Sequence, residues 1–434
     1  MKTLNAEEAE RLVSQLSSHH GFIDYTDAGR QRRVVTAFPR KCWPVPRAKA
    51  AFLRLAENIE DVWNEFSAKD SQALPGGVMG TLFYEAGNHT VPGFSGTATT
   101  DTMDYGYIGV YLWQLTLDTS GEQPPRLEFH PGCDRETRER VLSLAGQKSD
   151  GPAPFVISRI FTADKPSQHY RRGVSRVLRY IHAGDCYQVN LSNKYTGDYR
   201  GAPYSAFRAL CLAVPVPHAA YVNAGAYQVI SISPELFLSI ERGRRVISKP
   251  IKGTRPRDPV SAENDQKIAT SLAAAEKDRA ENLMIVDLIR NDLSRFCEPF
   301  SVSVPRLFSI ESYQNVHQLV STVEGKLRAD ITPFHAFLSA FPGGSITGAP
   351  KRRAMEIIDE LEAHSRGPYC GSVFRWDFSN NLESNIAIRT LMTDSQGEIH
   401  CWAGCGIVAD SDPDDEYRES VDKVQKLMKV LEAL

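Results

Sequence analysis

The chain has 434 residues, a formal charge of -3 at pH 7, 42% apolar residues and 24% charged residues. This composition is ordinary for a soluble globular protein, and the length is ample for one large core or for two domains. The near-neutral charge argues against a surface dedicated to nucleic acid or to a membrane.

The N-terminal part mixes helices with strands. It opens with a predicted helix, followed by a charged strand at 30–38 and a second helix at 48–66. The sequence GGVMGTLFYEAG at 76–87 predicts a glycine-rich turn that leads into a strand. The run at 107–119 is rich in aromatic and β-branched residues and predicts another strand.

One stretch indicates a boundary in the chain. The sequence GQKSDGPAP at 146–154 has the composition of a linker or an exposed loop. We therefore expect an N-terminal part at 1–145 that packs on a core at 155–434.

The core part alternates groups of strands with helices. Its predicted elements are a helix at 168–183, strands at 187–195, 221–233 and 235–241, a long helical segment at 262–296, three strand-like runs and a final helix from about 414. Strands in antiparallel-looking groups with helices between the groups predict an α+β fold rather than a doubly wound sheet. No GxGxxG follows a strand, so the pattern does not indicate a dinucleotide site.

The sequence gives no sign of export or membrane insertion. Its opening residues, MKTLNAEEAERLVSQL, carry acids and lack the apolar segment of a secretory signal. No run approaches the roughly 18 apolar residues that span a bilayer. Eight cysteines occur without a CxxC pair, and the spacing of Cys401 and Cys405 is a poor pattern for zinc. We expect a cytoplasmic protein with reduced thiols.

Two helical segments carry acidic residues beside apolar faces. In the first, Asp278 and Glu281 are three residues apart and therefore neighbours on one helix face. In the last helix, an apolar face is formed by Tyr417, Ser420, Val424, Leu427 and Leu431, and a polar edge by Glu416, Glu419 and Lys423.

These acids have two interpretations. The first is a solvated surface with a Glu419–Lys423 pair that contributes about 0.3–0.5 kcal/mol. The second is a Mg2+ site, because this hard ion keeps several waters and takes one or two carboxylates. Spacing alone leaves both open.

The segment FPGGSITGAPKRRAMEIIDEL at 341–361 is a glycine-rich turn that leads into a helix. A P-loop needs Gly-Lys-Ser/Thr, whereas Gly348 is followed here by Ala349 and Pro350, so nucleotide binding is not favoured. Backbone N–H groups and the hydroxyls of Ser345 and Thr347 at a helix start suit a carboxylate instead.

Lys252 lies between Pro250 and Gly253 in SKPIKGTRPR, and Glu235 follows a strand in SISPE. A lysine attacks carbon only when it is neutral, so a nucleophilic role requires a lowered pKa. The competing interpretation is a solvated lysine beside arginines.

Taken together, the motifs resemble the chorismate-utilising enzymes, and among them the aminodeoxychorismate synthase component I branch. The resemblance runs from about 168 to 432 and rests on PIKGT, DRAENLMIVDLIRND, LVST, FPGGSITGAPK, IAIRTL and GIVADS in the family order. GGVMGTLFYEAG and YIGVYLW extend it more weakly into the N-terminal part.

The resemblance implies a fold and a site. The fold would be α+β, with two large antiparallel sheets packed together, helices outside, and the site in a cleft between the sheets. The chorismate-binding catalytic core would be 155–434. Glu281 and Glu419 would hold Mg2+, with Glu416 just outside that shell. Chorismate would be held by Ser345, Tyr369, Arg389, Gly404, Gly406 and Lys423.

The resemblance also implies a reaction, in para-aminobenzoate and folate biosynthesis. Lys252 would attack C2 of the chorismate ring as the C4 hydroxyl leaves, with Glu235 as the general acid. Ammonia would then enter at C4 and expel the lysine, giving 4-amino-4-deoxychorismate. Related isochorismate and salicylate synthases carry a water-activating lysine where this chain has Gln188, which argues against water as the nucleophile.

The ammonia would come from a separate glutamine amidotransferase subunit. Glutaminases of the usual partner type use a nucleophilic cysteine with a His-x-Glu pair, and no histidine of this chain has glutamate two residues later. Free ammonium would be a weaker substitute. Neither a nucleic-acid partner nor a membrane is expected.

Three positions depart from the family pattern. Gln318 stands where the family usually has histidine; His317 precedes it and should face the opposite side of a strand. Cys405 replaces a glycine, which could crowd the carboxylate pocket, and Ser420 replaces a threonine. The N-terminal part lacks a clear LLxS segment, so we do not predict tryptophan binding.

Two alternatives stay open. Anthranilate synthase component I is the sister activity, and Lys252 argues against it, because that branch has alanine there. A catalytically impaired regulatory subunit is suggested by Gln318 and Cys405, although all the acidic and lysine positions are present.

Overall fold

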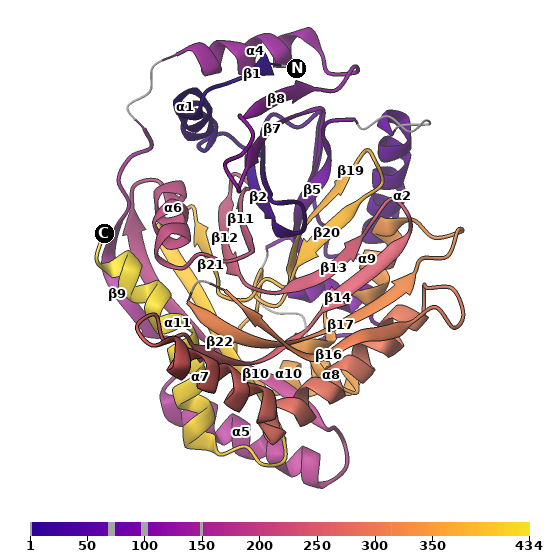
Figure 1. The fold of residues 1–434 in the computed structure, drawn as a ribbon, viewed down its shortest axis with the longest axis vertical. Helices are drawn as coiled ribbons and strands as arrows, with labels where there is room; N and C mark the ends of the chain where they lie inside the picture. The colour runs from indigo at the N-terminus through magenta and orange to yellow at the C-terminus, as the bar shows by residue number, and fades with distance from the viewer. Residues whose placement is uncertain (1, 68–73, 97–102, 148–150, 314) are drawn as a thin grey trace.

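Two large antiparallel sheets form the frame of the molecule (Figure 1). The computed structural model describes residues 2–67, 74–96, 103–147, 151–313 and 315–434. Within these ranges one sheet has twelve strands and the other has ten. The predicted fold class, α+β with two packed antiparallel sheets and helices outside, is confirmed.

The first sheet contains, in spatial order, β1 (Lys2–Thr3), β8 (Arg126–Phe129), β7 (Trp113–Asp118), β3 (Arg32–Thr36), β2 (Ile23–Asp27), β11 (His218–Asn223), β12 (Tyr227–Ser233), β21 (Thr390–Asp394), β22 (Glu398–Ile407), β10 (Gln188–Arg200) and β18 (Gly348–Ala349), with β9 (Val156–Ala163) pairing with β10. The second contains β15 (Ile251–Pro256), β17 (Val316–Lys326), β14 (Arg245–Lys249), β13 (Leu236–Ile240), β20 (Leu382–Asn385), β19 (Ser372–Asp377), β5 (Gly77–Leu82), β6 (Gly106–Tyr111) and β4 (Lys41–Pro44), with β16 (Ser303–Ser312) pairing with β17.

The helices surround the sheets, and α5, α7, α8 and α11 gather toward the lower end of Figure 1. Their bounds are α1 (Ala6–Leu16), α2 (Lys49–Phe66), α3 (Gly87–Thr90), α4 (Arg135–Gly146), α5 (Ser167–His182), α6 (Pro203–Ala213), α7 (Ala262–Ala274), α8 (Glu276–Ser294), α9 (Pro333–Ala340), α10 (Lys351–Leu361) and α11 (Pro413–Glu432). No helix of the described ranges is long and apolar enough to cross a membrane. All eight cysteines are free thiols, as expected.

The last helix, α11, forms where the sequence predicts it. Asp412 caps its N-terminus by accepting hydrogen bonds from the backbone N–H groups of residues 414 and 415. Pro413 occupies the first helical position, where no N–H is needed. The buried side of the helix carries Ser420, Val424, Leu427 and Leu431. Its predicted polar edge faces the neighbouring strand β22, where Lys423 donates to the carbonyl oxygen of Gly404.

The N-terminal part contributes strands to both sheets. β2 pairs with β11 in the first sheet, and β5 pairs with β19 in the second. Each sheet therefore combines strands from both sides of the stretch 146–154. Residues 148–150 of that stretch lie outside the described residues, and the division of the chain there stays a prediction.

Three predicted elements are wrong in their extent. The run at 107–119 is two strands, because the chain passes from the second sheet (β6) to the first (β7) at the buried Leu112. The segment at 262–296 is two helices, because Ala275 adopts an extended conformation with ψ of 104°. The run at 221–233 is a hairpin that turns at Gly225, whose φ of +82° favours glycine.

A buried ion pair joins α8 to α10 beside the glycine-rich turn. Lys351 Nζ lies 2.8 Å from Asp292 Oδ2 and also donates to the carbonyl oxygen of Ala340. The two charged side chains are 10% and 7% exposed. Removing one partner would leave an uncompensated buried charge, which costs more than a surface charge does.

We therefore expect Asp292→Ala to lower the free energy of unfolding by about 3–5 kcal/mol. Urea unfolding followed by circular dichroism measures it. Asp287→Ala is the matched control on the same helix, because its ion pair with Arg290 is largely exposed and should contribute less than about 1 kcal/mol. Equal effects of the two substitutions would contradict the prediction.

Candidate active site

A cavity of about 610 Å3 is lined by strands of both sheets and by α8 and α11. The structure brings all ten residues singled out from the sequence to its wall: Glu235, Lys252, Glu281, Ser345, Tyr369, Arg389, Gly404, Gly406, Glu419 and Lys423. They come from segments up to 188 residues apart, since the first is 235 and the last is 423. The roles assigned to these residues stay predictions.

Glu235 is a buried carboxyl group on the wall of this cavity. It lies between β12 and β13 and is 6% exposed. Burial raises the pKa of Glu235 to about 7, although Lys252, the hydroxyl of Ser345 and Arg389 oppose the shift. A carboxyl group with such a pKa is suited to give up a proton near neutral pH.

The burial of Glu235 predicts a pH-dependent effect on stability. Its folded pKa exceeds the ordinary value, so its favourable contribution is complete below about pH 4.5 and lost as the pH rises through about 7. Glu235→Gln removes this loss. We expect the stability of the variant relative to wild type to increase by about 3 kcal/mol between pH 4.5 and pH 8.

Urea unfolding at a series of pH values measures this difference. Glu263→Gln is the control, because Glu263 is exposed in the first turn of α7. A difference between Glu235→Gln and wild type that stays constant with pH would contradict the prediction.

Lys252 stands on β15, opposite Leu319 of β17. The next residue, Gly253, has a φ of +75°, and a Cβ there would lie 2.8 Å from Cγ of Asp278 on α8. Glycine is therefore required both by conformation and by the close approach of α8. That approach brings the strand carrying Lys252 against the helix carrying Glu281.

Glu281 and Glu419 face the same cavity from α8 and α11. Burial raises the pKa of Glu281, and the neighbouring carboxylates Asp278 and Glu419 add to the rise. Glu419 is more exposed, and its Oε1 lies 2.9 Å from Lys423 Nζ. Two mutually repelling carboxylates on one cavity wall fit the donor set that Mg2+ takes.

Lys423 is held in place by more than Glu419. Its Nζ donates to the carbonyl oxygen of Gly404 at 3.0 Å and lies 3.4 Å from Sγ of Cys405. Cys405 is 1% exposed and also contacts the backbone of Glu416. Its side chain packs toward α11, and among residues 404–406 the two glycines line the cavity and Cys405 does not, so the expected crowding by Cys405 is wrong.

The strand alternation around Gln318 is confirmed. Gln318 lines the cavity, whereas His317 faces away and bonds to Asp265 and Ser312. Its Nε2 is 2.9 Å from Asp265 Oδ1, and its Nδ1 is 2.7 Å from Ser312 Oγ. His317 therefore has a structural place behind the sheet and cannot reach the site.

Tyr369 and Arg389 approach the cavity from loops before β19 and β21. Tyr369 is 3% exposed. Arg389 has a φ of +51°, a conformation that a non-glycine side chain rarely adopts and that is often retained at functional sites. Burial lowers the pKa of Arg389. A guanidinium presented in this way suits a carboxylate ligand.

Sequence reasoning missed several residues of the wall. Lys277 precedes Glu281 by one turn of α8, and Asn190 pairs with Gly406 across β10 and β22. Helical spacing would have suggested Lys277. Asn190 has no such signal, because cross-strand pairing between positions more than 200 apart is a product of the fold. Thr254, Arg255 and Trp402 also line the cavity and were not singled out.

The sequence has close relatives of known name. It is 41% identical, over an alignment of 453 positions, to aminodeoxychorismate synthase component 1 of Klebsiella aerogenes, covering 98% of this chain and 97% of the relative. The protein of the same name from Escherichia coli K12 is 41% identical over 325 residues, covering 75% and 70%. Anthranilate synthase component 1 of Thermus thermophilus is 41% identical over 308 residues, covering 70% and 66%.

Solved structures share the architecture. Anthranilate synthase component I of Streptococcus pneumoniae TIGR4 superposes with a TM-score of 0.73 at 26% identity, covering 95% of this chain and 91% of that one. The menaquinone-specific isochorismate synthase of Escherichia coli superposes with a TM-score of 0.75 at 16% identity, covering 99% and 93%, which concerns the fold alone. Residues 26–429 match the family model described as chorismate binding enzyme. The chain therefore belongs to the chorismate binding enzyme family.

Proposed function

We propose that the chain is the chorismate-aminating component of aminodeoxychorismate synthesis. The relative that matches nearly the whole chain is named aminodeoxychorismate synthase component 1, whereas the anthranilate synthase component 1 of Thermus thermophilus matches 70% of the chain. The observation that carries the proposal is the position of Lys252 and Glu235 on one cavity wall, with electrostatic coupling between them.

In the proposed reaction, the neutral amine of Lys252 forms a bond to C2 of the chorismate ring. Both conjugated double bonds of the ring shift, the C4–O bond breaks, and Glu235 gives its proton to the departing hydroxyl, which leaves as water. Ammonia then forms a bond to C4, both double bonds shift back, and the bond from C2 to Lys252 breaks. The added nitrogen loses one proton, which restores the acid form of Glu235. A buried acid with a pKa of about 7 supports the role of Glu235.

The remaining residues of the wall would bind the substrate. Chorismate is a dicarboxylate, and the cavity offers it Lys423, Arg389, the hydroxyls of Ser345 and Tyr369, and the close backbone of Gly404 and Gly406. Glu281 and Glu419 would hold Mg2+, which supplies positive charge for the ring carboxylate when bound. The ammonia would come from a separate glutamine amidotransferase subunit, as the numbered name of the relatives suggests.

The test is incubation of the purified chain with chorismate, MgCl2 and ammonium at mildly alkaline pH. Products are separated by chromatography and identified by mass. The proposal expects 4-amino-4-deoxychorismate. Anthranilate would move the assignment to the sister activity. No turnover, with or without an added glutaminase, would favour an impaired subunit.

A further inference from the structure

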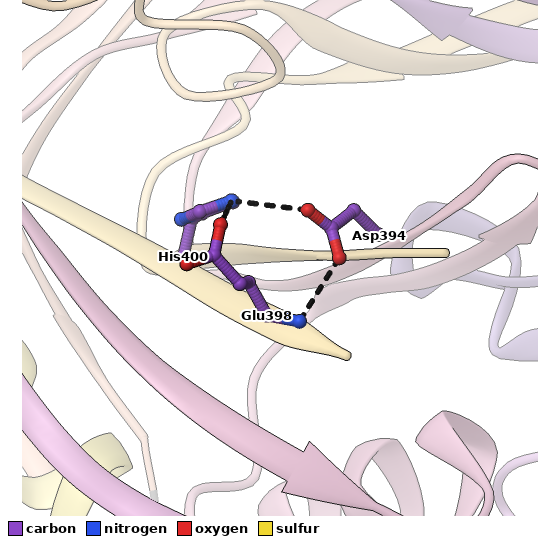
Figure 2. Close-up of side chains that lie close together, drawn as sticks. All are labelled: Asp394, Glu398 and His400. Atoms are coloured by element: carbon purple, nitrogen blue, oxygen red, sulfur yellow. Dashed lines mark hydrogen bonds and ion pairs between the residues drawn. The ribbon is translucent and has the colours of Figure 1, made fainter. Parts of the chain in front are cut away.

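A second group of metal-ligating side chains lies at the turn between β21 and β22 (Figure 2). Asp394 ends β21, Glu398 begins β22, and His400 follows two residues later on the same face of that strand. One ligand atom from each of the three lies within 4.8 Å of the other two. None of the three lines the cavity of the candidate active site.

The imidazole of His400 is oriented by a contact on its far side. Nδ1 lies 3.2 Å from Oγ1 of Thr196, and that hydroxyl donates its one proton to Asp164 Oδ1 at 2.7 Å. Since a carboxylate only accepts, Thr196 has no proton left for the ring, and Nδ1 must be the donor. A histidine that donates from one ring nitrogen to an oriented oxygen presents a lone pair at the other, as metal-binding histidines do.

The other ring nitrogen faces two carboxylates at ion-pair distance. Nε2 of His400 lies 3.8 Å from Asp394 Oδ2 and 3.9 Å from Glu398 Oε2, the two contacts that are dashed in Figure 2. Both distances exceed that of an ordinary hydrogen bond. The side chain is 9% exposed and is therefore more than nine-tenths buried.

The two carboxylates are also partly fixed. Asp394 Oδ1 accepts the backbone N–H groups of Gln396 and Glu398, both at 2.9 Å, which turns Oδ2 toward the ring. Glu398 is 45% exposed, and its Oε1 lies 3.8 Å from Arg159, which is itself bonded to Asp198. The side chain of Glu398 is thus free to change conformation when an ion binds, whereas the side chains of Asp394 and His400 are already oriented.

We propose that Asp394, Glu398 and His400 form a binding site for a divalent transition-metal ion of the Zn2+ or Co2+ type. One imidazole nitrogen and two carboxylate oxygens are a donor set that zinc accepts, with water completing the coordination. The imidazole favours such ions over Mg2+, which prefers oxygen ligands alone. The ion would join β21 to β22 across their turn and stabilise the folded chain by mass action.

The first test is a Co2+ titration followed by visible absorption. The parent protein is Glu281→Gln/Glu419→Gln, which removes the carboxylates of the active-site cavity from the measurement. We expect the parent to bind one equivalent of Co2+, displaceable by Zn2+. Adding His400→Gln or Asp394→Asn should weaken binding at least tenfold, and adding Thr196→Val, which removes only the orienting hydroxyl, about tenfold.

The matched control is His335→Gln, because His335 is an exposed histidine on α9. It should leave the titration unchanged. Thermal unfolding gives an independent readout: Zn2+ should raise the melting temperature of the parent but not of its His400→Gln form, with equal melting temperatures in EDTA showing that both fold. The proposal would be overturned if the folded parent did not bind Co2+. It would also be overturned if the His400→Gln and Asp394→Asn forms bound Co2+ as tightly as the parent.

Discussion

Replacing Lys252 by alanine is expected to reduce the formation of 4-amino-4-deoxychorismate by at least about a thousandfold. Lys252 presents its amine to the cavity beside Glu235, and the proposed reaction needs that amine as nucleophile. Without this amine no nucleophile attacks C2, and ammonia would have to displace the C4 hydroxyl directly. The loss should therefore fall mainly on kcat, measured by product mass under saturating chorismate and ammonium.

A lysine on the preceding strand of the chain provides the matched control. Lys249 on β14 pairs with Glu311 and does not line the cavity. Lys249→Ala removes a partly exposed ion pair and should leave kcat within about twofold, because such pairs contribute little. Retention of kcat within tenfold of wild type by Lys252→Ala would exclude the lysine as a required nucleophile. Mass analysis of rapidly quenched wild-type enzyme adds a direct test for the lysine adduct.

Much of the fold could be predicted from local patterns. The apolar face of α11 and the assignment of most runs as strands follow from periodicity, which depends on residues a few positions apart. The crossing of the chain from one sheet to the other at Leu112 could not be predicted, because two successive strands that are buried on both faces read as one continuous apolar run. The break at Ala275 has no glycine or proline to mark it, and tertiary packing overrides helix propensity there.

The site was predictable as a set of residues but not as a surface. Motif resemblance identified ten residues, and the fold brings them to one cavity. Its geometry depends on features without a sequence signal, such as the positive φ of Arg389 and the direction in which Cys405 points. The group of Asp394, Glu398 and His400 was missed for a related reason. The pattern Asp-x-x-x-Glu-x-His is ordinary for a hairpin turn. The ring of His400 is oriented by Thr196 on another strand, and the local sequence does not reveal that contact.

Glu281→Gln is expected to lower kcat/KM by at least about a hundredfold and to raise the Mg2+ concentration for half-maximal activity by at least about tenfold. Glu281 is the more buried of two carboxylates that repel each other across the cavity, and Mg2+ takes one or two such ligands. Substituting an amide removes one negative charge while keeping the shape of the side chain. Chelation of wild type with EDTA should likewise abolish activity, and MgCl2 should restore it.

The control for this substitution lies on the same helix. Glu276→Gln changes an exposed glutamate in the first turn of α8 that does not line the cavity, so its Mg2+ response should match wild type. A Mg2+ response of Glu281→Gln equal to that of Glu276→Gln would remove Glu281 from the metal site. Because kcat/KM and the Mg2+ midpoint are measured separately, that result would still leave a role for Glu281 in binding chorismate or shaping the cavity. The shift in the Mg2+ midpoint is therefore the measurement that distinguishes a ligand of the ion from a residue that only shapes the cavity wall.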